Sequence, residues 1–172
     1  FAAPDAYAGA PGPVAGVLAT ASKAMGIVGL LRILLVVAAP EGMEDSTTVW
    51  LIALAVLSVI TMTWGNIAAL GSTNPKRMLA YSSVAHAGYM LAAITAIGAL
   101  NWDAAHADTS RTAALAVVTA LMFHLVVLVC FKLGAFLVLS LLESENGGHT
   151  LESLGGLVKR EPFLAVAMFI FM

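Results

Sequence analysis

Two lysines and two histidines lie inside long apolar stretches of this sequence, where titratable side chains are rare. Lys23 is the twelfth residue of one stretch, and Lys132 lies about two-thirds of the way along another. His86 lies near the middle of a third stretch, and His124 precedes Lys132 by eight residues. A lysine at mid-membrane costs roughly 2.5–3.5 kcal/mol on insertion scales, so such groups normally face a bundle interior or water. The chemistry available to them is proton uptake and release.

Hydroxyl groups surround His86 at helical spacing. Ser82, Ser83 and Tyr89 lie at i−4, i−3 and i+3 from it, which predicts that they share one helix face with the imidazole. An imidazole can accept a proton on one nitrogen and release one from the other, and hydroxyls can hold water between titratable groups. Lysines, histidines and hydroxyls inside a helix bundle are therefore the parts of a proton path.

Each of these residues also has a structural interpretation. A histidine inside a bundle can fix packing by a hydrogen bond to a neighbouring helix, which would explain His86, or His124 among its Leu, Val and Phe neighbours. An ion pair would explain Lys132, but the apolar stretches contain no Asp or Glu, so its counter-charge must come from residues outside this chain or from another subunit. For Lys23 the insertion cost favours a functional role.

The composition assigns these residues to a membrane protein. Of the 172 residues, 60% are hydrophobic and 10% are charged, whereas an ordinary soluble domain has about 25% charged residues. This argues against a soluble enzyme, a nucleic-acid binder or a disordered tail. The expected fold class is all-α, a polytopic transmembrane helix bundle in which residues 1–172 form a fragment of a single membrane domain. The expected spans are about 12–39, 47–70, 75–100 and 112–142, with the start of a further span at 163–172.

The charges between these spans predict an orientation. The 71–77 turn and the 143–161 loop each carry an adjacent Lys and Arg. The connection between the first two spans and the connection between the last two spans are mainly acidic. The positive-inside rule therefore places the N-terminus, this turn and this loop on the cytoplasmic side, with Lys76 and Arg77 as simple interfacial anchors. Arg32 lies near the outer end of the first span and disagrees, unless its side chain extends to the surface.

Other chemistries find little support in the sequence. The single cysteine, Cys130, excludes an internal disulfide and a cysteine-ligated zinc site, and the histidines lack metal-ligand spacing, so we expect no metal site. There is no nucleotide-binding glycine motif and no nucleophile motif. The chain begins at Phe1 without a signal peptide, and residues 163–172 are half of the ~20 that a span needs, so we expect an internal segment of a longer protein.

Residues 76–89 read Lys-Arg-Met-Leu-Ala-Tyr-Ser-Ser-Val-Ala-His-Ala-Gly-Tyr. This run is similar to the Lys-Arg-Leu-(Leu/Ile)-(Ala/Gly)-Tyr-Ser-Ser-x-x-His-x-Gly-(Tyr/Phe) motif of the antiporter-like subunits of respiratory complex I. Residues 4–14, followed by Ser22 and Lys23, resemble the Pro-Asp-Val-Tyr-x-Gly-Ala-Pro-x-Pro-Val…Ser-Lys stretch of the subunit N branch, and residues 133–136 are similar to its later helix. The Tyr-x-Gly-Ala-Pro form favours this branch, with its mitochondrial NADH dehydrogenase subunit 2 relatives, over branches L and M.

The resemblance implies a membrane subunit of about fourteen helices built from two inverted repeats. It implies a part of the proton-pumping NADH:quinone oxidoreductase of a bacterial inner membrane, an enzyme complex to which this chain contributes proton movement and no redox chemistry. No cofactor is expected in this chain, because NADH, FMN, iron–sulfur clusters and quinone belong to partner subunits. The expected partners are an M-like subunit, small K-, J- and A-like subunits and membrane lipid, with no nucleic acid.

On this resemblance, Lys23 corresponds to the central lysine that links the cytoplasmic half-path to an axis at mid-membrane, and His86 corresponds to a histidine on that axis. Lys132 departs from the pattern, because many relatives have Asn or Ser there. The input glutamate–lysine pair and the exit lysine are expected outside residues 1–172. The expected proton relay consists of Lys23, His86, Lys132 and His124, supported by Ser82, Ser83 and Tyr89.

Two other functions stay open. An Mrp-type cation/proton antiporter subunit shares the Lys-Arg…Tyr-Ser-Ser motif, and sodium dependence of transport would distinguish it. A structural spacer of the membrane arm would transmit conformational change without conducting protons. The spacer predicts that neutralising Lys23 leaves pumping intact.

Overall fold

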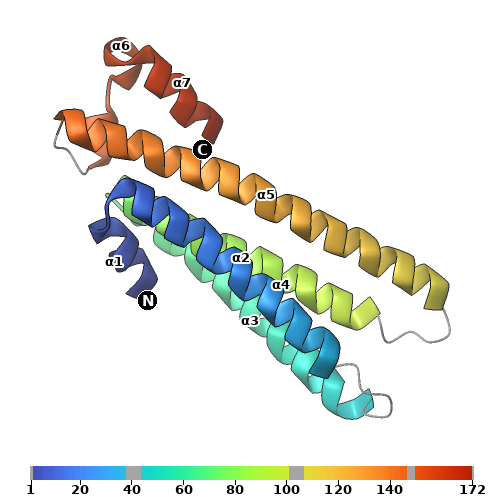
Figure 1. The fold of residues 1–172 in the computed structure, drawn as a ribbon. Helices are drawn as coiled ribbons and strands as arrows, with labels where there is room; N and C mark the ends of the chain where they lie inside the picture. The colour runs from blue at the N-terminus through green and yellow to red at the C-terminus, as the bar shows by residue number, and fades with distance from the viewer. Residues whose placement is uncertain (1, 38–43, 101–106, 147–149, 172) are drawn as a thin grey trace.

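The computed structural model describes residues 2–37, 44–100, 107–146 and 150–171, and every regular element in this part of the chain is a helix (Figure 1). The all-helical class predicted from the sequence is confirmed. The elements are α1 (Ala2–Gly9), α2 (Gly12–Val37), α3 (Glu44–Leu70), α4 (Pro75–Leu100), α5 (Ala107–Asn146), the short 3-10 helix η2 (Leu151–Leu154), α6 (Leu157–Arg160) and α7 (Pro162–Phe171).

Four of the described helices are long and apolar enough to cross a membrane: Gly12–Ile33, Val49–Leu70, Pro75–Leu100 and Thr109–Ser144. Helix α5 has 40 residues, which at about 1.5 Å per residue makes it roughly twice as long as the ~30 Å hydrocarbon core is thick. It extends beyond the expected 112–142 at both ends, because the flanking residues are polar but include no Pro or Gly that would break a helix.

Two shorter features set the start of the chain and of α4. The first is α1, which was not predicted from the sequence, a helix of eight residues that ends before Pro11 and packs against α4. Helix α4 begins as its Asn-Pro signal indicates: the Asn74 side chain accepts hydrogen bonds from the backbone N–H groups of Lys76 at 2.9 Å and Arg77 at 3.3 Å. This cap fixes the start of the helix that carries most of the candidate residues.

Small residues bring α3 and α4 into close contact. A Cβ atom at Gly88 would lie 2.7 Å from the backbone nitrogen of Met62, and one at Gly65 would lie 2.6 Å from that of Ala85. Ser58 uses this proximity to donate a hydrogen bond to the Gly88 carbonyl at 2.8 Å. The two backbones approach here because neither glycine has a side chain.

Helix α2 lies against α5 and α4 (Figure 1). A Cβ at Gly16 would lie 3.3 Å from Phe136 Cβ, and one at Gly12 would lie 2.8 Å from the Phe136 carbonyl oxygen. Gly26 and Gly29 differ, because nothing lies within 4 Å of a Cβ built on either. Among the described contacts, the glycines of α2 therefore bring it close to a neighbouring helix only in its first half.

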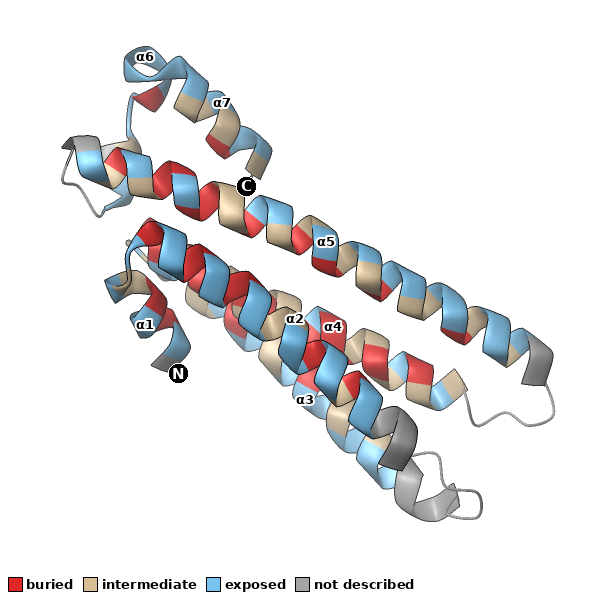
Figure 2. Cartoon of the chain, viewed as in Figure 1, coloured by how far each residue is buried: buried red, intermediate tan, exposed pale blue. Residues whose placement is uncertain are grey.

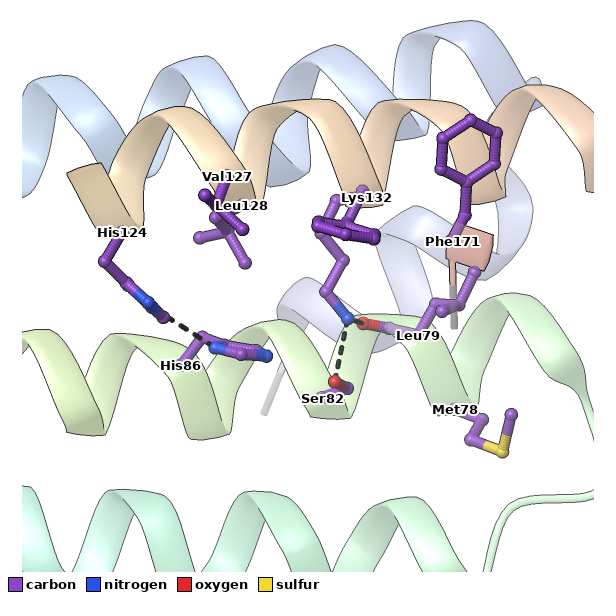
Figure 3. Close-up of a pocket in the computed structure, with 10 residues that line it drawn as sticks. Met78, Leu79, Ser82, His86, His124, Val127, Leu128, Lys132 and Phe171 are labelled. Carbon is purple, nitrogen blue, oxygen red and sulfur yellow. Dashed lines mark hydrogen bonds between the residues drawn. The ribbon is translucent and has the colours of Figure 1, made fainter. Parts of the chain in front are cut away.

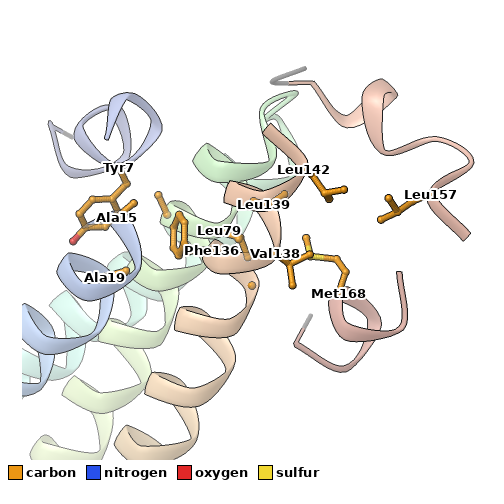
Figure 4. Close-up of a cluster of buried hydrophobic side chains, with 12 residues drawn as sticks. Tyr7, Ala15, Ala19, Leu79, Phe136, Val138, Leu139, Leu142, Leu157 and Met168 are labelled. Carbon is orange, nitrogen blue, oxygen red and sulfur yellow. The ribbon is translucent and has the colours of Figure 1, made fainter. Parts of the chain in front are cut away.

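Buried apolar side chains form two clusters, on faces that α2, α4 and α5 share (Figure 2). The Phe136 cluster lies toward the 71–77 turn and also includes residues of α1, α6 and α7 (Figure 4). The Met90 cluster lies toward the opposite end of α2, α4 and α5. Its members are Ile27, Leu31, Met90, Ile94, Ile97, Leu121, Leu125 and Leu128.

The outer surface of α3 is apolar. Trp50, Ile52 and Ile67 are among its large side chains, and each is more than half exposed. A solvent-facing helix would carry charge there, so this surface suits lipid or further protein.

Candidate functional site

Lys132 reaches from α5 to α4 between the two apolar clusters (Figure 3). Its Nζ donates hydrogen bonds to Ser82 Oγ at 2.7 Å and to the Leu79 carbonyl at 3.3 Å, and the residue is 6% exposed. Both acceptors are neutral oxygens. They solvate the ammonium group without cancelling its charge, so the lysine can lose its proton without breaking an ion pair.

Lys23 reaches α4 from α2. Its Nζ donates to Ser83 Oγ, and Ser83, which is fully buried, donates in turn to the Ala19 carbonyl at 3.3 Å. The ring of Tyr7 lies 6.0 Å from the same ammonium group, and its hydroxyl donates to the Leu18 carbonyl at 3.3 Å. Burial raises the pKa of Tyr7, so this hydroxyl stays a neutral donor. Helix α1 thus contributes to the surroundings of Lys23.

The two serines divide the predicted polar face. Consecutive helix residues point about 100° apart, and here Ser82 faces Lys132 of α5 whereas Ser83 faces Lys23 of α2. The expectation that the hydroxyls and His86 form one stripe is therefore wrong. The consequence is that two lysines from different helices meet the same turn of α4.

His86 and His124 meet one turn further along α4. His86 Nδ1 and His124 Nε2 are 3.3 Å apart, and the ring centroids are 5.2 Å apart (Figure 3). One nitrogen must donate and the other accept, so the contact requires matched tautomers. Sequence spacing placed each histidine on its own helix but gave no register between α4 and α5, and so did not predict this pair.

Tyr89 is held on a different side of α4. Its ring meets His86 edge-on, with centroids 5.4 Å apart, and its hydroxyl accepts a hydrogen bond from Asn66 Nδ2 of α3 at 3.0 Å. Tyr89 is 40% exposed. It therefore orients the His86 ring from the side rather than extending the line of buried hydroxyls, and the sequence analysis did not single out Asn66.

A cavity of about 410 Å³ connects the α4 and α5 groups. Its lining combines Ser82, His86, His124 and Lys132 with apolar side chains, including Phe171 of α7 (Figure 3). Water occupies about 30 Å³ per molecule in the liquid, so this volume can hold several molecules between the lysine and the histidines. Lys23 is not among the lining residues, because it lies across α4.

An ion pair that the sequence analysis missed lies at the 71–77 end. Lys76 Nζ is 2.6 Å from Glu143 Oε2, and the lysine side chain is 6% exposed. The interpretation of Lys76 as a simple interfacial anchor is therefore wrong. The signal was present: Lys76 is the first basic residue of α4, and Glu143 is the first acidic residue after the apolar stretch of the antiparallel α5. Arg77 pairs instead with Asp5 at 2.7 Å, with both side chains well exposed.

Among the residues that the structure describes, no three His, Cys, Asp or Glu side chains lie close enough together to hold a metal ion. His106 and His149 lie outside the described residues. The groups brought together are amines, imidazoles and hydroxyls, which can exchange protons with water.

Comparison with known proteins finds similarity along nearly the whole chain. Residues 3–172 match the family model described as "NADH:quinone oxidoreductase/Mrp antiporter, TM". NADH-quinone oxidoreductase subunit N 2 of Roseiflexus castenholzii is 42% identical over 171 residues, which are 99% of this chain and 32% of that protein. NADH-quinone oxidoreductase subunit N of Rubrobacter xylanophilus is 41% identical over 172 residues, which are 100% of this chain and 31% of that protein.

This chain spans about a third of the length of the curated relatives that it matches. No solved structure matches it. The predicted resemblance is confirmed by the family model and by relatives named subunit N at about 40% identity. The chain therefore belongs to the NADH:quinone oxidoreductase/Mrp antiporter transmembrane family, within which it is similar along its whole length to NADH-quinone oxidoreductase subunit N.

Proposed function

We propose that this chain is part of a proton-translocating membrane-arm subunit of a bacterial NADH-quinone oxidoreductase. The observation that carries the proposal is the meeting of Lys23 and Lys132, from two different helices, at consecutive serines of α4. A lysine held in place by an opposite charge would have to break an ion pair before it could lose its proton. Both lysines instead bind neutral oxygens, an arrangement that suits repeated loss and gain of a proton.

The proposed relay has two parts on either side of α4. Lys23 exchanges its proton at Ser83, and Lys132 exchanges its proton at Ser82, within the same helical turn. From Lys132, water in the cavity continues to His86 and His124. Each transfer moves one proton between neighbouring nitrogen and oxygen atoms. At a histidine, one ring nitrogen accepts a proton while the other releases one.

The rest of the enzyme supplies the driving force in this proposal. NADH, FMN, iron–sulfur clusters and quinone belong to other subunits, and an M-like subunit and small K-, J- and A-like subunits are the proposed neighbours in the bacterial inner membrane. Electron transfer then acts on this chain from a distance, through conformation or electric field. The names of the relatives support only the assignment to an NADH-quinone oxidoreductase.

An Mrp-type cation/proton antiporter subunit is the second candidate, because the description of the matched family includes it. The subunit N names of the relatives favour the oxidoreductase. Replacing Na⁺ by choline in the transport assay separates the two, since an antiporter loses its exchanged cation and the oxidoreductase keeps pumping.

The test compares wild type with Lys23→Ala in the intact protein, in membrane vesicles, with assembly followed by native gel. We expect NADH-quinone turnover and proton uptake to fall together by about tenfold or more, as for loss of an acid–base group. Lys159→Ala, at an exposed residue of α6, is the matched control and should leave both rates unchanged. Normal rates in an assembled Lys23→Ala enzyme would favour the spacer.

A further inference from the structure

A second charged site lies at the 71–77 end of the interface between α2, α4 and α5. Glu143 of α5 pairs with Lys76 of α4, and Lys76 Nζ also donates to the Ala10 carbonyl, between α1 and α2, at 3.2 Å. The pair thus contacts the same helices that carry the relay lysines and serines.

Helix geometry puts the pair in line with the relay. Residues 11 apart on an α-helix point within about 20° of each other, so Glu143 shares the face of α5 that carries Lys132. Residues seven apart also point within about 20°, so Lys76 shares the face of α4 that carries Ser83. The axial distance along α5 from Glu143 to Lys132 is about 16.5 Å at 1.5 Å per residue.

Apolar side chains fill this distance. Leu79 of α4 and Phe136 and Leu139 of α5 belong to the Phe136 cluster, and their exposures are 4%, 0% and 3% (Figure 4). Phe136 is further enclosed by Gly12 and Gly16 of α2. This layer is mainly apolar, with the hydroxyls of Tyr7 and Ser140 as polar groups in or beside it, and it separates the two titratable sites.

The two members of the pair differ in access to water. The Lys76 side chain is 6% exposed, whereas that of Glu143 is 19% exposed. The carboxylate is therefore the more accessible member of the pair in this part of the protein, and the ammonium group is the more enclosed one.

We infer that Glu143 is the proton-loading carboxylate at the 71–77 end of the path, and that Lys76 is its positioning residue; this inference rests on the proposed function. Glu143 takes one proton from water and becomes a neutral acid, and its ion pair with Lys76 becomes a hydrogen bond. When water enters the Phe136 layer, the proton passes to the unprotonated amine of Lys132. Glu143 is then a carboxylate again, and the ion pair re-forms.

The test uses variants of Glu143 in the assembled complex in membrane vesicles. Glu143→Gln keeps the size and a hydrogen-bond acceptor for Lys76 but cannot carry a proton, and it should lower proton uptake and coupled turnover by about fivefold or more. Glu143→Asp keeps the carboxylate and should retain at least about half of both rates. Asp5→Asn breaks the other, well-exposed ion pair at this end and should change neither rate.

A double variant guards against simple misfolding. Lys76→Met with Glu143→Leu removes both charges together, which preserves stability better than leaving one charge unpaired. An assembled double variant that does not pump supports the inference. An assembled double variant or Glu143→Gln enzyme that pumps normally overturns it. Lys23→Ala is measured in parallel: if Lys23→Ala abolishes pumping while these variants pump, the proposed function stands and the role of Glu143 fails, and if all pump, both fail.

Discussion

At the scale of single residues, the internal lysines differ in the groups that they bind. Lys23 and Lys132 donate to serine hydroxyls and, for Lys132, to a backbone carbonyl. Lys76 pairs with a carboxylate instead. The chain therefore contains both types of internal lysine, one held by neutral oxygens and one held by an opposite charge. The first type suits relay of protons, and the second suits control over a neighbouring acid.

The histidine pair allows the packing and relay interpretations to be separated. Gln in place of His86 or His124 can still form a hydrogen bond between α4 and α5, but it cannot exchange protons by changing tautomer. We expect His86→Gln to assemble normally and to lower proton uptake by about fivefold or more. The measurement is proton uptake in vesicles alongside a native gel. Full uptake by both Gln variants would show that the histidines only fix packing.

The residue types were predictable from the sequence, whereas their partners were not. The cost of placing Lys23 and Lys132 among apolar residues identifies them without any structure. The Ser82–Lys132 bond and the His86–His124 contact depend on the register between α4 and α5, which local spacing does not encode. The roles assigned to these residues stay predictions.

At the scale of helices, α4 organises the site. It starts at the Asn74 cap, packs on α3 through Gly88 and Ala85, and presents Ser82 to α5 and Ser83 to α2. Small displacements of α4 would change the distances to both lysines at once. Its position is set by backbone contact with α3 rather than by flexible side chains.

Replacing Gly88 tests this role of α4. A Cβ at this position meets the Met62 backbone at 2.7 Å, so even Gly88→Ala must move one helix. Overpacking of this kind costs about 1–3 kcal/mol. In a thermal scan, we therefore expect the variant to lose half of its assembled protein at a lower temperature than the wild type. Gly26→Ala is the matched control, because nothing lies within 4 Å of its Cβ. Equal thermal stability of the two variants would contradict the close α3–α4 contact.

Helices were predicted correctly where a long apolar run marks them. Their ends were missed where polar residues continue the helix. The Asn-Pro start and apolar run from Pro75 identify α4 with the bounds found in the structure. Helix α5 continues to Asn146 through residues expected to form a loop, and α1 precedes the first expected span. Neither extension has an apolar pattern of spanning length that would reveal it.

At the scale of the whole molecule, a polar layer lies between two apolar clusters. The Phe136 cluster separates this layer from the 71–77 end, and the Met90 cluster separates it from the other end. The apolar outer surface of α3 indicates lipid or protein neighbours around this arrangement. Such a layer can hold protons at mid-bundle while both apolar clusters block direct passage. That residues 1–172 form one membrane domain, with the 71–77 end in the cytoplasm, stays a prediction.

A double-mutant cycle tests whether Lys23 and Lys132 belong to one proton path. Proton uptake and NADH-quinone turnover are measured together for Lys23→Ala, Lys132→Ala and the double variant in assembled complex. Steps in series fail together, so we predict that each single variant falls by about tenfold or more and that the double variant falls little further. Near-normal pumping by either assembled single variant, or a double loss equal to the product of the two single losses, would contradict a shared path.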